Sequence, residues 1–256
     1  MQLQIRLTYL YPYHMNLYGD TGNILCLQHR CQARNIDLKI QPIHPTDNYV
    51  PSGTDLYFFG GGQDAQQLHV GKDLLRHQQI IREDIENGAA ALTICGGYQL
   101  FGEYFLTSRQ QRIPGIQIFS AHTRGSNHRM IGNIICELPE NLYQQIQQAY
   151  PNAPNTLVGF ENHSGETILS DNQTPLAKVK YGYGNDYTSK QEGLLFHNAI
   201  GTYMHGSLLP KNPHLADYII AKALQHRYQE QIALLPLDDS LALQAHNYVL
   251  NRFRNS

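Results

Sequence analysis

The sequence predicts an α/β protein with a largely parallel central sheet flanked by helices. Strand-like apolar segments alternate with segments of helical spacing through the first hundred residues, a pattern typical of layered α/β folds. In addition, residues 89–94 are apolar without polar alternation. This is expected of a central strand that is covered on both faces.

The first half of the chain is predicted to alternate strands and helices. The strands span residues 4–10, 36–43, 55–59 and 89–94, and the helices span residues 21–34 and 70–87. In the first helix Ile24, Leu27 and Cys31 recur at helical spacing. Gly88 is typical of a helix end and terminates the second helix.

The second half is richer in strands and loops. Strands are predicted near residues 130–137, 156–160, 176–180, 193–197 and 199–204, and helices over residues 213–227 and 239–254. Asn212 and Pro213 are typical of a helix start. The order of these strands in a sheet does not follow from the sequence.

The chain is expected to form a single domain over residues 1–256. Its length suits one large α/β core, and the sequence holds no internal repeat or interdomain linker. In the last helix Leu241, Ala245, Tyr248 and Val249 recur at helical spacing. This favours packing of that helix on the same domain over packing on a partner.

The composition excludes several classes of protein. Hydrophobic residues make up 41% and charged residues 16% of the chain, as in ordinary soluble enzymes. The net charge of −2, without a cluster of Lys and Arg, argues against nucleic acid as a partner. We expect a cytoplasmic protein, because no signal peptide and no apolar stretch of ~18 residues is present. The four cysteines form no C-x-x-C pair, so no metal site is expected.

Cys95 is the strongest candidate nucleophile. It follows an apolar strand and precedes Gly96-Gly97 and a predicted helix, so it lies at a sharp strand-to-helix turn. Such a turn exposes the sulfur at the carboxyl edge of the sheet, and a helix N-terminus stabilises the reactive thiolate. A small buried cysteine that packs beneath a glycine turn is the alternative.

A cysteine nucleophile needs a base, and the chain has 13 histidines. His205 ends a strand-like run and is followed by Gly206, so it also lies at a strand end. His163, in the segment Gly159-Phe-Glu-Asn-His163, is the main rival. For both histidines the alternative is a structural side chain that bonds a loop.

The segment Gly60-Gly61-Gly62 forms a glycine-rich turn after the third strand. It matches no phosphate-binding motif. Main-chain N–H groups in such a turn suit an oxyanion better, since one preorganised donor is worth roughly 3 to 4 kcal/mol in an acyl-transfer transition state. A tight turn without a ligand is the alternative.

Taken together, three motifs resemble the cobyric acid synthase-like branch of class I glutamine amidotransferases. They are Gly60-Gly61-Gly62, Cys95-Gly-Gly-Tyr-Gln99 and Gly201-Thr-Tyr-Met-His205-Gly206. Three further segments resemble, more narrowly, the glutaminase subunits of lipid II isoglutaminyl synthases. They are Gly159-Phe-Glu-Asn-His163, Arg129-Met-Ile-Gly132, and Leu209-Pro-Lys-Asn-Pro213 with Leu215-Ala-Asp217. The resemblance covers residues 1–230, and residues 231–256 are expected to form a helical extension.

The resemblance implies a flavodoxin-like fold and a defined reaction. Cys95 would attack the carboxamide of L-glutamine while His205 relays the proton. A γ-glutamyl thioester and ammonia would form, and water would then release glutamate.

The same matching implies the residues that bind the substrate. Main-chain N–H groups of Gly61 or Gly62 and of Gly96 would form the oxyanion hole. Gln99 and Arg129 would hold the α-amino and α-carboxylate ends of glutamine, because a guanidinium grips a carboxylate through two parallel bonds.

The resemblance also implies a heterodimer with a Mur ligase-like partner, MurT. The ammonia would pass to MurT, which amidates the α-carboxyl of D-glutamate in the lipid II stem peptide during peptidoglycan synthesis. ATP and Mg²⁺ are expected on that partner only, and this chain is expected to hold no cofactor.

One position departs from the pattern of the class. Class I amidotransferases usually carry His-x-Glu, but Ser207 stands in the second position after His205. In this branch an acidic residue of MurT can complete the site, so we expect glutaminase activity to be weak without the partner.

Three other functions remain open. The chain could serve a different acceptor, such as a corrinoid carboxylate, because the cysteine and histidine motifs are shared across the branch. It could also be a non-catalytic scaffold of the ligase, which the intact pair Cys95 and His205 argues against. A hydrolytic peptidase on the same sheet would cleave peptides without a partner.

Overall fold

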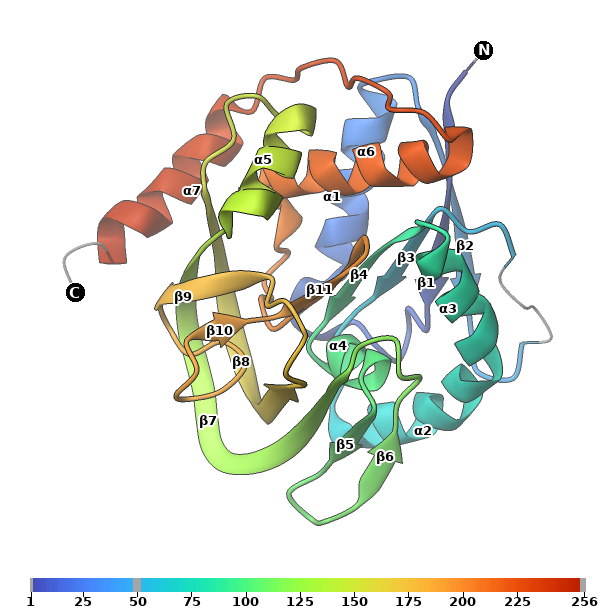
Figure 1. The fold of residues 1–256 in the computed structure, drawn as a ribbon, viewed down its shortest axis with the longest axis vertical. Coiled ribbons are helices and arrows are strands. Elements are labelled where there is room, and N and C mark those ends of the chain that lie inside the picture. The colour runs from blue at the N-terminus through green and yellow to red at the C-terminus, as the bar shows by residue number, and fades with distance from the viewer. Residues whose placement is uncertain (1, 48–51, 254–256) are drawn as a thin grey trace.

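The computed structural model describes residues 2–47 and 52–253, and two sheets organise this part of the chain (Figure 1). The first sheet contains six strands among the described residues, in the order β11-β12-β4-β3-β1-β2. Its strands are β1 (Gln4–Leu10), β2 (Asp37–Ile43), β3 (Leu56–Phe59), β4 (Ala90–Ile94), β11 (Leu194–Phe196) and β12 (Ala199–Thr202). All neighbouring pairs are parallel except β11 and β12. This confirms the predicted α/β class with a largely parallel sheet.

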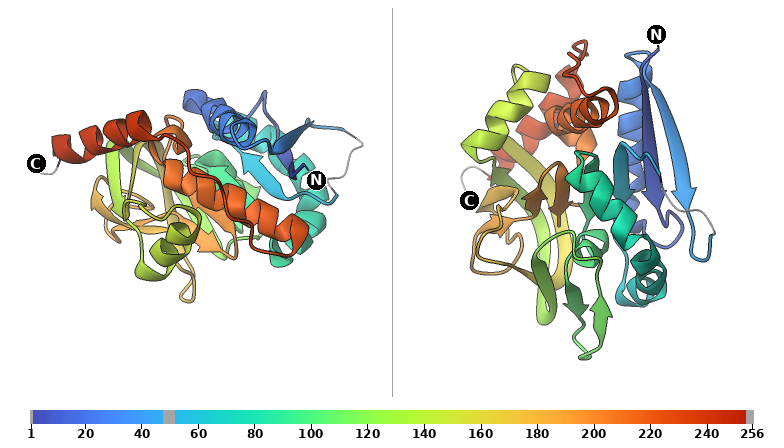
Figure 2. Two further views of the ribbon diagram at one scale, coloured as in Figure 1. Left: turned by 90° about the horizontal axis from the view of Figure 1, so that it is seen from above. Right: turned by 45° about the vertical axis from the view of Figure 1, so that its right-hand side comes forward.

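Helices cover both faces of this sheet. Apolar side chains of α1 (Thr21–Gln32), α5 (Glu140–Ala149) and α6 (Pro213–Tyr228) belong to one buried cluster. Those of α2 (Asp64–Leu74), α3 (Gln78–Glu86) and α4 (Gly96–Phe101) belong to a second cluster. The central strands β3 and β4 are fully buried, because each supplies side chains to both clusters. The views in Figure 2 show the helices as outer layers around the sheet.

The second sheet is mainly antiparallel and lies beside the first (Figure 1). It is formed by β5 (Tyr104–Leu106), β6 (Arg112–Pro114), β7 (Ala121–Glu137), β8 (Thr156–Leu169), β9 (Ala177–Tyr181) and β10 (Gln191–Glu192). The long pair β7 and β8 dominates it, with a register shift between Gly125 and Met130. The sequence predicted only the apolar ends of these two strands, because their remaining residues are polar on the side that faces a cleft.

One predicted helix differs from the structure, and the last one agrees with it. The helix predicted over residues 70–87 is two helices, α2 and α3, joined by the short 3-10 turn Leu75–His77. The first of these helices begins at Asp64, earlier than predicted. The sequence did not indicate this start because Gln67, which the helix buries, is polar. The last helix, α7 (Ser240–Phe253), does lie against the domain, near β8.

The predicted packing of α7 on the domain is confirmed, but most of its apolar stripe is exposed and only Val249 is half-buried. Leu241 is 78% exposed and Tyr248 66% exposed, and Ala245 is exposed as well. The buried anchor of the helix is His246, whose Nδ1 and Nε2 bond the Lys211 carbonyl and the Thr156 hydroxyl at 2.9 Å each. A polar residue therefore fixes the helix, which a search for apolar periodicity does not find.

Candidate active site

Three adjacent strands end at one edge of the first sheet and bring the candidate residues together. β3, β4 and β12 are neighbours and run parallel, so their carboxyl ends meet. Gly60-Gly61-Gly62 follow β3, Cys95 follows β4, and His205 lies just beyond β12. Segments more than a hundred residues apart in the chain thus form one site.

Cys95 stands at a strained turn between β4 and α4. Its φ of 48° and ψ of −104° are unusual for a residue with a side chain. The main-chain N–H donates to the Thr202 carbonyl at 2.8 Å, which fixes the turn to β12. A Cβ on Gly97 would lie 2.6 Å from the Phe59 carbonyl oxygen. Only glycine fits there, and this close packing leaves the half-buried Cys95 side chain at the cleft.

His205, and not His163, lies beside Cys95. The His205 side chain is fully buried and hydrogen-bonds the cysteine. Its main-chain N–H donates to the Phe160 carbonyl at 2.6 Å. Burial disfavours the charged imidazole, but the negative charge of Cys95 and the bond to Asp20 outweigh it and raise the pKa of His205 to about 10. The imidazolium form of His205 is therefore favoured.

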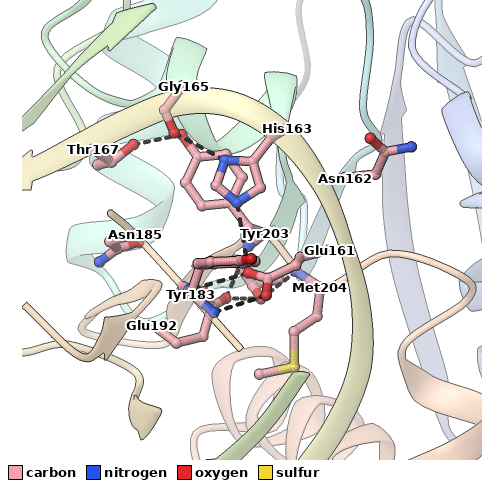
Figure 3. A network of polar contacts seen from close by, with 12 residues as sticks. Glu161, Asn162, His163, Gly165, Thr167, Tyr183, Asn185, Glu192, Tyr203 and Met204 are labelled. Atoms are coloured by element: carbon pink, nitrogen blue, oxygen red, sulfur yellow. Dashed lines mark hydrogen bonds and ion pairs between the residues drawn. The ribbon is translucent and has the colours of Figure 1, made fainter. Parts of the chain in front are cut away.

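His163 belongs instead to the wall of the site, and Figure 3 shows the network of polar contacts around it. Its ring stacks on that of Tyr203 with centroids 3.6 Å apart and planes 6° apart. Nδ1 donates to the Gly165 carbonyl at 2.9 Å, and Nε2 lies 3.8 Å from a Glu161 carboxylate oxygen. Burial lowers the pKa of His163, which favours the neutral ring. These contacts fit the structural role that the sequence left open.

Asp20 is a site residue that the sequence analysis missed. It lies on the loop before α1 and is fully buried. Its Oδ1 is 3.4 Å from His205 Nδ1, and its Oδ2 accepts the Gly61 main-chain N–H at 2.6 Å. In the sequence, an aspartate just before a helix indicates an N-cap, and this hides any other role.

The glycine turn presents one residue to the cleft and one away from it. The Gly61 N–H is engaged by Asp20, whereas Gly62 lines the cleft together with Cys95. A Cβ on Gly96 would lie 2.9 Å from the Gly62 nitrogen, so the main chains of Gly62 and Gly96 are in close contact next to the sulfur.

Gln99 is buried beneath the cleft, and both ends of its amide have protein partners. Its Nε2 donates to the Tyr203 hydroxyl at 3.1 Å, and its Oε1 accepts from Gln67 Nε2 at 2.9 Å. Gln67 also donates to the Gly62 carbonyl at 3.1 Å. Gln99 thus connects the cleft floor to the glycine turn, an arrangement that its spacing from Cys95 alone could not predict.

Arg129 reaches the same cleft from the second sheet. It lies in the irregular part of β7 between Gly125 and Met130, and its side chain is largely exposed. Its Nε donates to Asn162 Oδ1 at 2.7 Å. The cleft has a volume of about 640 Å³ and is lined by Cys95, His205, Gln99, Gly62 and Arg129, among others. The structure therefore brings together the residues that the sequence singled out.

Several known proteins are similar in sequence to this chain. The CobB/CobQ-like glutamine amidotransferase domain matches residues 6–213. The chain is 35% identical over 240 residues to GatD, a subunit of the glutamine-hydrolysing lipid II isoglutaminyl synthase of Staphylococcus aureus, covering 93% of this chain and 91% of that protein. It is equally identical to GatD of Streptococcus pneumoniae, covering 93% of this chain and 88% of the relative. A probable cobyric acid synthase of Methanocaldococcus jannaschii is 30% identical, over 66% of this chain and 33% of the relative.

Solved structures share the fold at low sequence identity. PurLQS from Thermotoga maritima superposes with a TM-score of 0.57 at 12% identity, covering 90% of this chain and 99% of that one. The glutaminase domain of Trypanosoma brucei CTPS gives a TM-score of 0.55 at 14% identity, covering 90% and 96%. The fold, the match over residues 6–213 and the identity to GatD agree. The chain belongs to the CobB/CobQ-like family of glutamine amidotransferases.

Proposed function

We propose that this chain is the glutaminase subunit of a lipid II isoglutaminyl synthase. It hydrolyses L-glutamine to glutamate and supplies the ammonia to a Mur ligase-like partner, MurT. The observation that carries the chemistry is the pairing of Cys95, at a strained strand-to-helix turn, with the buried His205. The identity to GatD over 93% of the chain supports the choice of pathway.

The reaction begins with attack of the Cys95 thiolate on the glutamine carboxamide carbon. The tetrahedral intermediate carries a negative oxygen, which the main-chain N–H groups of Gly62 and Gly96 stabilise. The His205 imidazolium donates its proton to the leaving nitrogen, so that ammonia departs and a thioester remains. His205 then takes a proton from water, which attacks the thioester and releases glutamate.

The contacts of the glycine turn favour one of the two alternatives for the oxyanion hole. Gly61 and Gly62 were alternatives there, and the bond from Gly61 N–H to Asp20 favours Gly62. Arg129 is suited to the α-carboxylate of the substrate, because it lines the cleft and carries a planar guanidinium. Gln99 supports the floor, and its Oε1 retains a second lone pair for the substrate α-amino group.

The partner uses the ammonia. In this proposal MurT amidates the α-carboxyl of D-glutamate in the lipid II stem peptide, and ATP and Mg²⁺ bind to MurT. No helix among the described residues is long and apolar enough to cross a membrane. In this proposal the lipid II precursor is reached through the partner.

Ammonia release tests this function. The purified chain is incubated with glutamine, with and without MurT, and ammonia is followed with Cys95→Ser as the control. We expect release by the wild type and none above background by the variant, with the higher rate in the complex. Lipid II and ATP added to the complex should yield amidated precursor. No ammonia from the wild-type complex would contradict the proposal.

A second acceptor of the ammonia is the alternative to the D-glutamate carboxyl. The similarity to cobyric acid synthase favours a corrinoid carboxylate as the alternative acceptor. That similarity covers a smaller part of this chain than the match to GatD does. Copurification with a Mur ligase-like protein would support MurT as the partner, whereas copurification with a corrinoid-binding subunit would support the alternative.

A further inference from the structure

The loop before α1 directs a carboxylate into the site instead of onto the helix. Asp20 immediately precedes Thr21, where an aspartate ordinarily accepts an N–H of the first helical turn. It makes no such capping bond. Asn16 Oδ1 accepts the Thr21 N–H at 2.9 Å in its place. The Asp20 carboxylate is therefore available to point inward.

The two oxygens of this carboxylate have separate partners. Oδ1 lies 3.4 Å from His205 Nδ1, and Oδ2 accepts the Gly61 N–H at 2.6 Å. The side chains of Asp20 and His205 are both fully shielded from solvent. Because Nδ1 donates to the carboxylate, Nε2 is the ring nitrogen left to exchange a proton with Cys95 and the substrate.

Ser207 explains why the acid comes from this loop. Ser207 Oγ donates to the Gly19 carbonyl at 2.8 Å. A Cβ placed on Gly22 would lie only 2.0 Å from Ser207 Oγ. The loop and the start of α1 therefore pack directly on position 207. A glutamate at 207 would need the space that the loop now fills. The small serine and the inward carboxylate are thus two parts of one arrangement.

The charges around His205 fit a positioning role for Asp20. Three groups face the imidazole: Cys95 from the turn after β4, Asp20 from the loop before α1, and His163 from β8. Burial disfavours the imidazolium, the first two groups favour it, and the net effect raises the pKa of His205. Burial lowers the pKa of His163, so this ring adds little charge at neutral pH.

We propose that Asp20 is the acidic positioning residue of this site and orients His205 from within the chain. This inference rests on the proposed glutaminase function. It assigns to the chain itself the acid that the sequence analysis expected from MurT. The same carboxylate accepts the Gly61 N–H, so it also connects the base to the glycine turn that carries one of the two oxyanion donors, Gly62. In this arrangement MurT consumes the ammonia without completing the triad.

Asp20→Asn separates the charge of this residue from its shape. An asparagine can still accept the Gly61 N–H through its oxygen, but it then presents an amide N–H to His205 Nδ1. The imidazole would carry its proton on Nε2 and lose its ability to accept one there, as in the corresponding substitution in serine triads, where the rate falls about 10⁴-fold. Here we expect kcat to fall by at least about tenfold. This loss is smaller than in serine triads because a thiolate nucleophile depends less on its base than a hydroxyl does.

Asp55→Asn is the matched control. Asp55 is also a buried aspartate whose carboxylate pairs with a histidine, at 3.2 Å from His226 Nδ1, but it lies outside the cleft lining. Both variants and the wild type are assayed with saturating glutamine, alone and with MurT. Asp20→Asn should lower kcat in both settings with a smaller effect on KM, and Asp55→Asn should leave kcat of the folded protein unchanged.

A second measurement does not depend on glutamine turnover. The rate of Cys95 alkylation by iodoacetamide is followed from pH 5 to pH 10, with Cys95→Ser as the blank. Loss of the Asp20 charge destabilises the imidazolium, so alkylation of Asp20→Asn should slow near neutral pH and reach its half-maximal rate at higher pH than in the wild type. A purely structural role would leave this profile in place.

The two measurements also distinguish failure of the inference from failure of the function. Unchanged kcat and an unchanged alkylation profile in Asp20→Asn would overturn the role of Asp20, whatever the acceptor. A kcat that recovers fully once MurT is added would overturn it as well, because the partner would then supply the acid. If Asp20→Asn shifts the alkylation profile but the wild type releases no ammonia, the positioning role of Asp20 is supported and the proposed glutaminase function is rejected.

Discussion

At the scale of single residues, an amide side chain helps to position an exposed arginine. Arg129 lies in a stretch of β7 where the pairing with β8 is interrupted, so the backbone alone fixes it poorly. Asn162 accepts from its Nε at 2.7 Å, and this bond holds the guanidinium at the wall of the cleft that Arg129 lines. The segment that contains Asn162 and His163 thus forms part of the wall of the site.

Asn162→Ala should therefore weaken glutamine binding more than turnover. We expect KM to rise severalfold with kcat nearly unchanged, because an ordering contact is removed that acts equally on bound substrate and transition state. Arg129→Ala should raise KM further, by at least about tenfold, since it removes a charged hydrogen bond worth ~1.5–3 kcal/mol. The control is Arg124→Ala, an exposed arginine of the same strand that lies outside the cleft lining. Initial rates over a range of glutamine concentrations give KM and kcat for each variant. An unchanged KM in Asn162→Ala would contradict the anchoring role.

The residues that sequence could and could not identify differ in a physical way. Cys95 and His205, which lie side by side in the structure, could be proposed from the sequence because a strand end next to glycine leaves a local pattern in the chain. Asp20 was missed because its role arises from a contact with a residue 185 positions away, and its local pattern indicates a helix cap. Gln67 was missed because a buried polar side chain interrupts the apolar period that marks a helix.

At the scale of elements, polar anchors determine how the C-terminal region is attached. Arg30 on α1 bonds Asp217 of α6 and Asp239 before α7, with closest distances of 2.6 Å to each carboxylate. All three side chains are largely buried. Together with His246, this ion cluster joins α7 to the rest of the domain. The sequence predicted that the helix exists but assigned its contacts to the wrong face, because apolar periodicity does not register buried ion pairs.

His246→Ala should loosen α7 selectively. The substitution removes two hydrogen bonds and leaves the Thr156 hydroxyl and the Lys211 carbonyl without their partner. We expect the helix to lose about 1–3 kcal/mol of local stability. Hydrogen exchange measured by mass spectrometry should show faster exchange in residues 240–253 and little change in β3 and β4. Tyr248→Ala, on the exposed side of the same helix, is the control, and equal exchange in the two variants would count against the anchor.

At the scale of the whole molecule, the site depends on how the two sheets meet. The first sheet supplies Cys95 and His205, and the second supplies Arg129 with its anchor. The parallel arrangement of the first sheet followed from the sequence, since alternation of strands and helices determines it. The second sheet did not, because its strand order depends on long-range antiparallel pairs whose polar residues leave no clear periodicity.

One buried carboxylate links the sheets directly behind the site. Glu192 belongs to β10 of the second sheet and accepts from the Thr202 hydroxyl at 2.5 Å and from the Tyr203 N–H at 2.8 Å. These residues lie at the end of β12, just before His205. Burial, together with the nearby Glu161 carboxylate, raises the pKa of Glu192 to about 7. The junction of the sheets is thus sensitive to pH near neutrality.

The raised pKa of Glu192 makes the stability of the whole fold depend on pH. Because the pKa is raised on folding, the folded chain holds more protons than the unfolded chain between about pH 4.5 and pH 7, and the free energy of unfolding falls as pH rises through that window. Glu192→Gln keeps the acceptor oxygen and cannot ionise, so it should remove this fall. We expect the free energy of unfolding of the variant to exceed that of the wild type by on the order of 2 kcal/mol at pH 8, and by less at pH 5.

Urea unfolding at pH 5, 6.5 and 8 measures this difference. Glu137→Gln, at a half-exposed glutamate, is the acid-to-amide control. A constant difference between Glu192→Gln and the wild type at all three pH values would show that Glu192 does not titrate in the folded protein.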